Sequence, residues 1–183
     1  MRSSIHILSG SSLVHPSELE GMADNISNIF GLRSISSRID PDLRRAYDPS
    51  RGQYNSTMLL SGFLERTPPG PDKNIILVDV DLFIPVLTFV FGEAQFEGTA
   101  AIVSTHRLSS QYYGLPGSHE LLLLRLEKEL IHELGHTFGL YHCRQFECVM
   151  RSSTYVEEID IKKAIPCHDC AARLREIYAG RVG

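Results

Sequence analysis

Six residues within one short stretch, from His132 to Cys143, have the types and spacing of a metal site. The stretch reads His-Glu-Leu-Gly-His-Thr-Phe-Gly-Leu-Tyr-His-Cys. His132 and His136 are four residues apart, so on a helix their imidazoles project from the same face. Two imidazoles on one helical face are the usual beginning of a zinc site. This spacing therefore predicts that the chain binds zinc.

Three further residues of the stretch complete a catalytic arrangement. Glu133 lies off the ligand face but close to the metal, where it can accept a proton from a water that the metal activates. Gly139 can adopt the left-handed conformation that ends a helix, so the chain can turn back and bring His142 to the same metal. A helix with surface histidines and a glycine cap is the alternative. The agreement of five positions with the required offsets argues against it.

The four cysteines of the chain all follow this motif, and they form two pairs: Cys143 with Cys148, and Cys167 with Cys170. The second pair has the C-x-x-C spacing, and two such pairs predict a closed, tetrahedral structural zinc site. Two disulfides are the alternative. Because the sequence shows no signal peptide, we expect a cytoplasmic location in which the thiols stay reduced and free to bind metal.

The same residues resemble the archaemetzincins, a metzincin-like family. The extended motif from His132 to His142 is followed at once by Cys143, then by Cys148, Met150 and the distal Cys167–Cys170 pair. The resemblance implies a zinc-dependent peptidase or aminopeptidase with one catalytic and one structural zinc, so two Zn²⁺ per chain. It also implies that Met150 lies in a turn beneath the catalytic zinc, where it would act as a packing residue.

We therefore expect a zinc metallopeptidase that hydrolyses peptide bonds with a zinc-activated water and Glu133 as general base. Its partner would be a peptide or protein substrate. Two other functions stay open: a zinc-stabilised binding or regulatory domain with little catalytic use, and a zinc hydrolase that acts on a non-peptide amide. The sequence does not separate aminopeptidase from endopeptidase action.

The composition is that of an ordinary globular protein. The 183 residues are 43% hydrophobic and 22% charged, and we expect one catalytic domain over 1–183, with a sheet-and-helix part (1–139) and a C-terminal part (140–183) that holds the cysteines. The net charge of −4 gives no electrostatic case for binding nucleic acid or an anionic membrane. Charged residues and prolines interrupt the longest apolar runs, so none should span a bilayer. We expect a monomer.

The elements that must position these residues follow the order β-α-β-α-β-β-α, with a loop-rich tail. We expect strands at 4–8, 33–39, 74–83 and 99–104, and helices at 16–30, 53–66, 120–138 and 169–179. Ser118 is a plausible N-cap for the long helix that carries the first two histidines. The fold class is α/β (α+β). The resemblance implies a mixed, twisted sheet in which the strand at 99–104 lines the cleft and offers its edge to an extended peptide.

Overall fold

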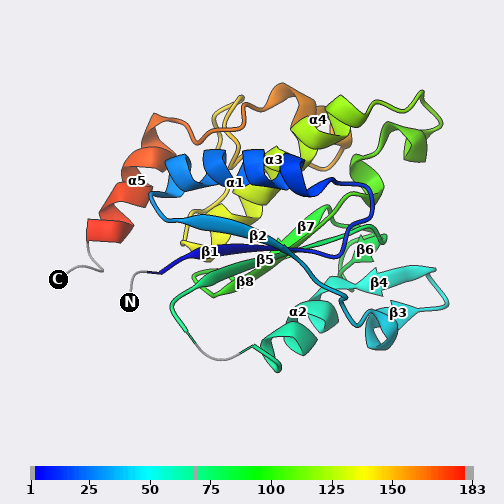
Figure 1. The fold of residues 1–183 in the computed structure, drawn as a ribbon. Helices are drawn as coiled ribbons and strands as arrows, with labels where there is room; N and C mark the ends of the chain where they lie inside the picture. Colours follow the sequence, from blue (N-terminus) through cyan, green and yellow to red (C-terminus); the bar gives the residue numbers. More distant parts are fainter. Residues whose placement is uncertain (1–2, 68–69, 180–183) are drawn as a thin grey trace.

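A five-stranded mixed sheet organises the chain in the computed structural model, which describes residues 3–67 and 70–179 (Figure 1). The strand order is β2-β1-β5-β8-β7. Four of these strands are parallel: β1 (Ile5–Ser9), β2 (Ser34–Arg38), β5 (Lys73–Val78) and β8 (Ala100–Ser104). The fifth, β7 (Gly92–Ala94), pairs antiparallel with β8. The expected α/β fold with a mixed sheet is confirmed.

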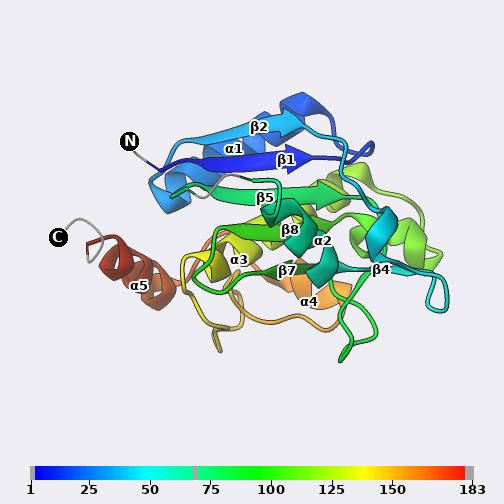
Figure 2. The same ribbon diagram turned by 90° about the horizontal axis from the view of Figure 1, so that it is seen from below.

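Helices cover both faces of this sheet. α1 (Pro16–Phe30) and α3 (His119–Thr137) lie on one face, and α2 (Ser56–Leu64) lies on the other (Figures 1 and 2). All residues of β8 are buried, as expected for a strand with a helix on each side. The described residues also include three short 3-10 turns, at Arg44–Ala46, His106–Leu108 and Ser110–Tyr113.

The central strand is shorter than predicted. The expected strand at 74–83 ends at Val78, because the carboxylate of Asp79 leaves the ladder and accepts hydrogen bonds from the hydroxyls of Ser11 and Thr105. Its last residues form β6 (Leu82–Phe83), which belongs to a small second sheet. The other strands of that sheet are β3 (Tyr47–Asp48) and β4 (Gln53–Asn55).

The predicted helix at 53–66 also starts later than expected. Its first three residues are β4, and α2 begins at Ser56. The reason is local: the side chain of Asn55 accepts a hydrogen bond from the backbone N–H of Met58 at 3.1 Å, which caps the helix at that point.

The strand at 99–104 is not an edge strand, which corrects the expectation drawn from the resemblance. β7 pairs with it from Gly92↔Val103 to Ala94↔Ala101, so β7 forms the free edge of the sheet. The three residues of β7 are glycine, glutamate and alanine, all poor strand formers. Its pairing with β8 therefore decides its conformation, and the local sequence does not reveal it.

The long helix α3 begins one residue before the predicted position, directly after the expected cap. The hydroxyl of Ser118 accepts a hydrogen bond from the N–H of Leu121 at 3.2 Å and caps it. Beyond α3, the C-terminal part contains α4 (Val156–Ile161), which the sequence did not indicate, and α5 (His168–Ala179), which starts one residue earlier than expected. In the described part of the chain, no helix is long and apolar enough to cross a membrane.

Candidate metal centres

The last turns of α3 place His132 and His136 with their ring nitrogens face to face. Their Nε2 atoms are 3.1 Å apart. Nδ1 of His132 is 2.8 Å from the carbonyl oxygen of Val149, and Nδ1 of His136 is 2.7 Å from that of Leu140. A carbonyl oxygen only accepts, so each Nδ1 carries the ring proton and each Nε2 presents a lone pair. Two lone pairs at this distance need a cation between them.

A left-handed turn brings the third histidine to the same place. Gly139 has a φ of 95°, and its N–H donates to the carbonyl of His136 at 3.0 Å. The chain leaves the helix there, and the ring of His142 lies 5.3 Å from that of His132 and 4.8 Å from that of His136, centroid to centroid. One ring nitrogen from each of the three histidines lies within 4.8 Å of the ring nitrogens of the other two.

The chemistry of the three rings fits a zinc ion. Burial lowers the pKa of all three histidines, and that of His132 falls well below its ordinary value. The rings are therefore neutral at neutral pH, which is the form that binds metal. Four ligands at about 2.05 Å around zinc stand about 3.3 Å apart. The distance of 3.1 Å between the Nε2 atoms of His132 and His136 is close to that value.

Glu133 faces the same space from α3 and lies against the edge strand. A Cβ atom on Gly92 of β7 would lie 2.7 Å from Cγ and 2.9 Å from Oε1 of Glu133. Both residues and the three histidines line a cleft of about 420 Å³, together with residues 152–154. Burial raises the pKa of Glu133 well above its ordinary value, and a cation bound beside it would favour the charged form again. The arrangement places a proton acceptor next to the metal ligands.

Met150 packs beneath the turn of α3 that separates the two histidines. It is fully buried, and its sulfur lies so close to Gly135 that a Cβ atom at that position would collide with it. The glycine within the motif therefore makes room for the methionine. The resemblance implies a place beneath the catalytic zinc for Met150, and that role stays a prediction.

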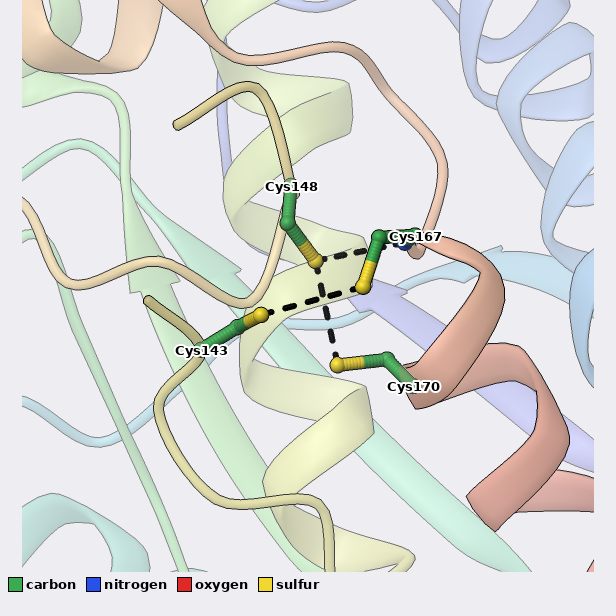
Figure 3. A group of neighbouring side chains, drawn as sticks. All are labelled: Cys143, Cys148, Cys167 and Cys170. Atoms are coloured by element: carbon green, nitrogen blue, oxygen red, sulfur yellow. Dashed lines mark hydrogen bonds between the residues drawn. The ribbon is translucent and has the colours of Figure 1, made fainter. Parts of the chain in front are cut away.

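The four cysteines converge on a second site (Figure 3). Sγ of Cys143 lies 3.7 Å from that of Cys167, and Sγ of Cys148 lies 3.8 Å from that of Cys170. A tetrahedral zinc with bonds of about 2.3 Å to four sulfurs has sulfur–sulfur edges of about 3.8 Å. A disulfide needs about 2.05 Å, and all four cysteines are free thiols. The geometry therefore fits the metal site and not the two disulfides.

Two other observations bear on the cysteine site. Burial raises the pKa of the thiols of Cys148 and Cys170, so a cation is needed to stabilise their thiolate forms. His168, inside the C-x-x-C stretch, does not join the cluster, because its side chain is 89% exposed. Among the residues that the structure describes, the four sulfurs make up the candidate ligand set.

Several contacts of the site could not be found from the sequence. The carbonyls that orient the histidines belong to Val149 and Leu140, and backbone acceptors leave no sequence signal. Gly92 gave a weak sequence signal, because a glycine in a strand often marks a close approach of another group. Glu129, one turn before Glu133, forms a buried ion pair with Lys162 at 3.5 Å, and nothing in the spacing of these two residues indicates it.

Comparisons with known proteins identify the family of the chain. A family model described as Peptidase family M54 matches residues 72–176. The chain is 37% identical over 158 residues to an archaemetzincin of Methanocaldococcus jannaschii, which covers 86% of each chain. It is 35% identical over 162 residues to an archaemetzincin of Thermococcus kodakarensis, covering 85% of this chain and 87% of the relative.

Solved structures give the same result. The crystal structure of an archaemetzincin from Methanopyrus kandleri matches with a TM-score of 0.84 at 32% identity, covering 97% of this chain and 96% of that one. A zinc-dependent peptidase from Methanocorpusculum labreanum matches with a TM-score of 0.80 at 30% identity, covering 93% and 100%.

Proposed function

We propose a mechanism for this chain from the premise that it belongs to the archaemetzincins, peptidase family M54, as the family model and its close relatives show. This confirms the resemblance seen in the sequence. The chain is therefore a zinc metallopeptidase, and its substrates are peptides or proteins. The residues that hold the metal and the way the reaction proceeds are our proposal.

His132, His136 and His142 hold the catalytic zinc. The observation that carries this assignment is the pair of unprotonated Nε2 atoms 3.1 Å apart, each fixed by a carbonyl at the opposite side of its ring. Three protein ligands leave a fourth position open for water or substrate. A zinc ion there supplies Lewis-acid chemistry: it lowers the pKa of water to about 7 and polarises the scissile carbonyl.

Glu133 is the general base. Its carboxylate takes a proton from the attacking water as the water oxygen bonds to the carbonyl carbon, and it then gives the proton to the leaving amine nitrogen when the C–N bond breaks. Its position against Gly92, at the edge strand, keeps it beside the path of the substrate. It is adjacent to His132 in the chain and off the ligand face, so it handles protons and does not hold the metal.

The edge strand β7 binds the substrate as an added strand. Glu93 lies opposite Ile102 in the antiparallel ladder, and the flanking hydrogen bonds run from Ser104 to Phe91 and from Gln95 to Ala100. Alternate residues bond to β8, so the backbone groups of Gly92 and Ala94 point to the open side. An extended peptide that pairs with them passes over Glu133.

Cys143, Cys148, Cys167 and Cys170 hold a second, structural zinc, so each chain binds two Zn²⁺. Metal analysis of the reduced protein tests this count. We expect two zinc ions per chain in the wild type and one in His136→Ala, with the four thiols still protected from alkylation. A single zinc in the wild type, with all thiols free to react, would contradict the cysteine site.

A peptide-library screen separates the peptidase from the two other functions considered. We expect cleavage by the zinc-loaded protein that stops when the catalytic zinc is removed and returns when zinc is added back. Peptide binding without cleavage would favour a binding domain. Hydrolysis of small amides without any cleavage of peptides would favour a hydrolase of another amide class.

A further inference from the structure

Two aromatic side chains stand exposed together beside the catalytic centre. The rings of Phe96 and Tyr141 are in contact, with centroids 4.5 Å apart and planes tilted by 37°. Phe96 is 43% exposed and Tyr141 is 74% exposed. Tyr141 immediately precedes the third histidine ligand, and Phe96 lies two residues beyond the end of β7. The pair therefore lies just beyond the end of the edge strand, with Tyr141 adjacent in the chain to the third histidine.

The backbone holds Phe96 in place even though its ring is open to solvent. The N–H of Gly98 donates to the carbonyl of Gln95 at 3.0 Å, which closes a tight turn around Phe96. Within this turn the backbone of Glu97 has a φ of 55°, a conformation that residues other than glycine rarely adopt. Its N–H donates to the carbonyl of His136 at 3.0 Å. Strained residues of this kind concentrate at functional sites.

Tyr141 is fixed from the other side. Leu140 before it is buried, its carbonyl accepts the hydrogen bond from His136, and its N–H donates to the carbonyl of Gly135 at 2.9 Å. His142 follows directly as a candidate ligand. Glu97, which follows Phe96, thus bonds to His136 at one end of the turn 136–142, and Tyr141 lies near its other end. A preformed aromatic surface of this kind loses little entropy when a ligand binds to it.

The position of the pair relative to β7 defines what it can contact. Glu133 lies against Gly92, the pairing with β8 continues to Gln95, and Phe96 is the first residue inside the turn that follows. An extended chain advances about 3.3 Å per residue. A peptide paired with β7 therefore carries a side chain over the aromatic pair two to four residues from its scissile bond.

We propose that Phe96 and Tyr141 form a substrate subsite that selects an aromatic or large aliphatic side chain two to four residues from the scissile bond. The inference rests on the proposed pairing of the substrate with β7. It adds the substrate class, which neither the metal site nor the comparisons define. Aromatic contacts between side chain and subsite account for the preference, and burying the exposed faces of both rings strengthens it.

Cleavage profiling with a peptide library tests this subsite. We expect the zinc-loaded wild type to favour aromatic or large aliphatic residues at one such position by about tenfold over glycine, and the double variant Phe96→Ser/Tyr141→Ser to lose this preference. Tyr141→Phe keeps the ring and should keep the preference. Tyr47→Ser is the matched control, because Tyr47 is 47% exposed and contacts Tyr54 in a similar ring pair on the three-stranded second sheet.

Peptide binding to Glu133→Ala makes the test independent of turnover. We expect a peptide with an aromatic residue at the favoured position to bind this zinc-loaded variant about tenfold more tightly than its glycine counterpart, and Phe96→Ser to remove the difference. Equal zinc content in all variants shows that the metal site is intact. A preference that survives in the double variant, or no preference in the wild type, would overturn the subsite. If the zinc-loaded wild type cleaved no peptide while the binding difference were retained, the proposed mechanism would be contradicted and the subsite would stand.

Discussion

Val149 accepts a hydrogen bond from His132, with 2.8 Å between the carbonyl oxygen and Nδ1, and this contact links the two candidate metal sites. Val149 follows Cys148 in the chain, and His142 is followed by Cys143. The N–H of Cys143 also donates to the carbonyl of Met150 at 2.9 Å. The loop 143–150 therefore carries two sulfur ligands of one site and orients two histidines of the other.

This relationship predicts that losing the cysteine site weakens the histidine site. Cys167→Ser removes a sulfur ligand that is distant in sequence from the histidines. We expect the affinity for the catalytic zinc to fall by about 10- to 100-fold, because the loop that orients His132 and His142 becomes loose. Competition with a chelator of known affinity measures the change. Unchanged affinity in a folded Cys167→Ser protein would show that the two sites are independent.

Mild chelation should remove the two metals in a fixed order. The histidine site has an open ligand position, whereas four sulfurs close the cysteine site, so the histidine-bound zinc should leave first. We expect the protein that keeps only the cysteine-bound zinc to unfold in one cooperative transition. Calorimetry at each chelator concentration measures this transition. Removal of both metals at the same chelator concentration would count against this order.

Gly135→Ala should destabilise the protein, because the new methyl group would collide with the sulfur of Met150 beneath the helix. We expect a loss of about 1–3 kcal/mol in the free energy of unfolding, measured with urea. Gly21→Ala is the matched control within a helix, since a Cβ atom there meets nothing within 4 Å. That substitution should stabilise by about 0.5–1 kcal/mol. Equal effects of the two substitutions would refute the packing of Met150 against α3.

The ion pair between Glu129 and Lys162 should be costly to break from one side. Both residues are 3% exposed, and their charged atoms are 3.5 Å apart. Glu129→Ala leaves the buried ammonium without its partner, and we expect a loss of about 3–5 kcal/mol in the free energy of unfolding. The double variant Glu129→Leu/Lys162→Met removes both charges and should lose much less. A double variant as unstable as the single one would show that the charges themselves are not responsible.

The candidate metal ligands could be identified from the sequence because their spacing indicates the chemistry. His132, His136 and His142 come from one short stretch, and local helix and turn geometry alone brings them together. Cys143 and Cys148 lie in the same region as these histidines, and only the distal C-x-x-C pair has to come from further along the chain. The bounds of α1 and the cap at Ser118 were equally local and agree with the prediction.

What the sequence missed depends on contacts between distant segments. The edge strand β7 consists of residues with little tendency to form strands, and only pairing with β8 orders it. The short helix α4 is held by a salt bridge from Arg125 of α3 to Asp160, at 2.7 Å, and by hydrogen bonds from Lys128 to backbone carbonyls. Such contacts join positions about 30 residues apart, and periodicity within a single element does not report them.

The assignment of Glu133 as the base is the central claim, and the hydrolysis rate of zinc-loaded Glu133→Ala tests it most directly. The variant should retain two zinc ions and the wild-type melting temperature, because Glu133 holds no metal. Its rate on any peptide that the wild type cleaves should fall by about 10²–10⁴-fold. An unchanged rate at equal zinc content would contradict the role of Glu133 as general base.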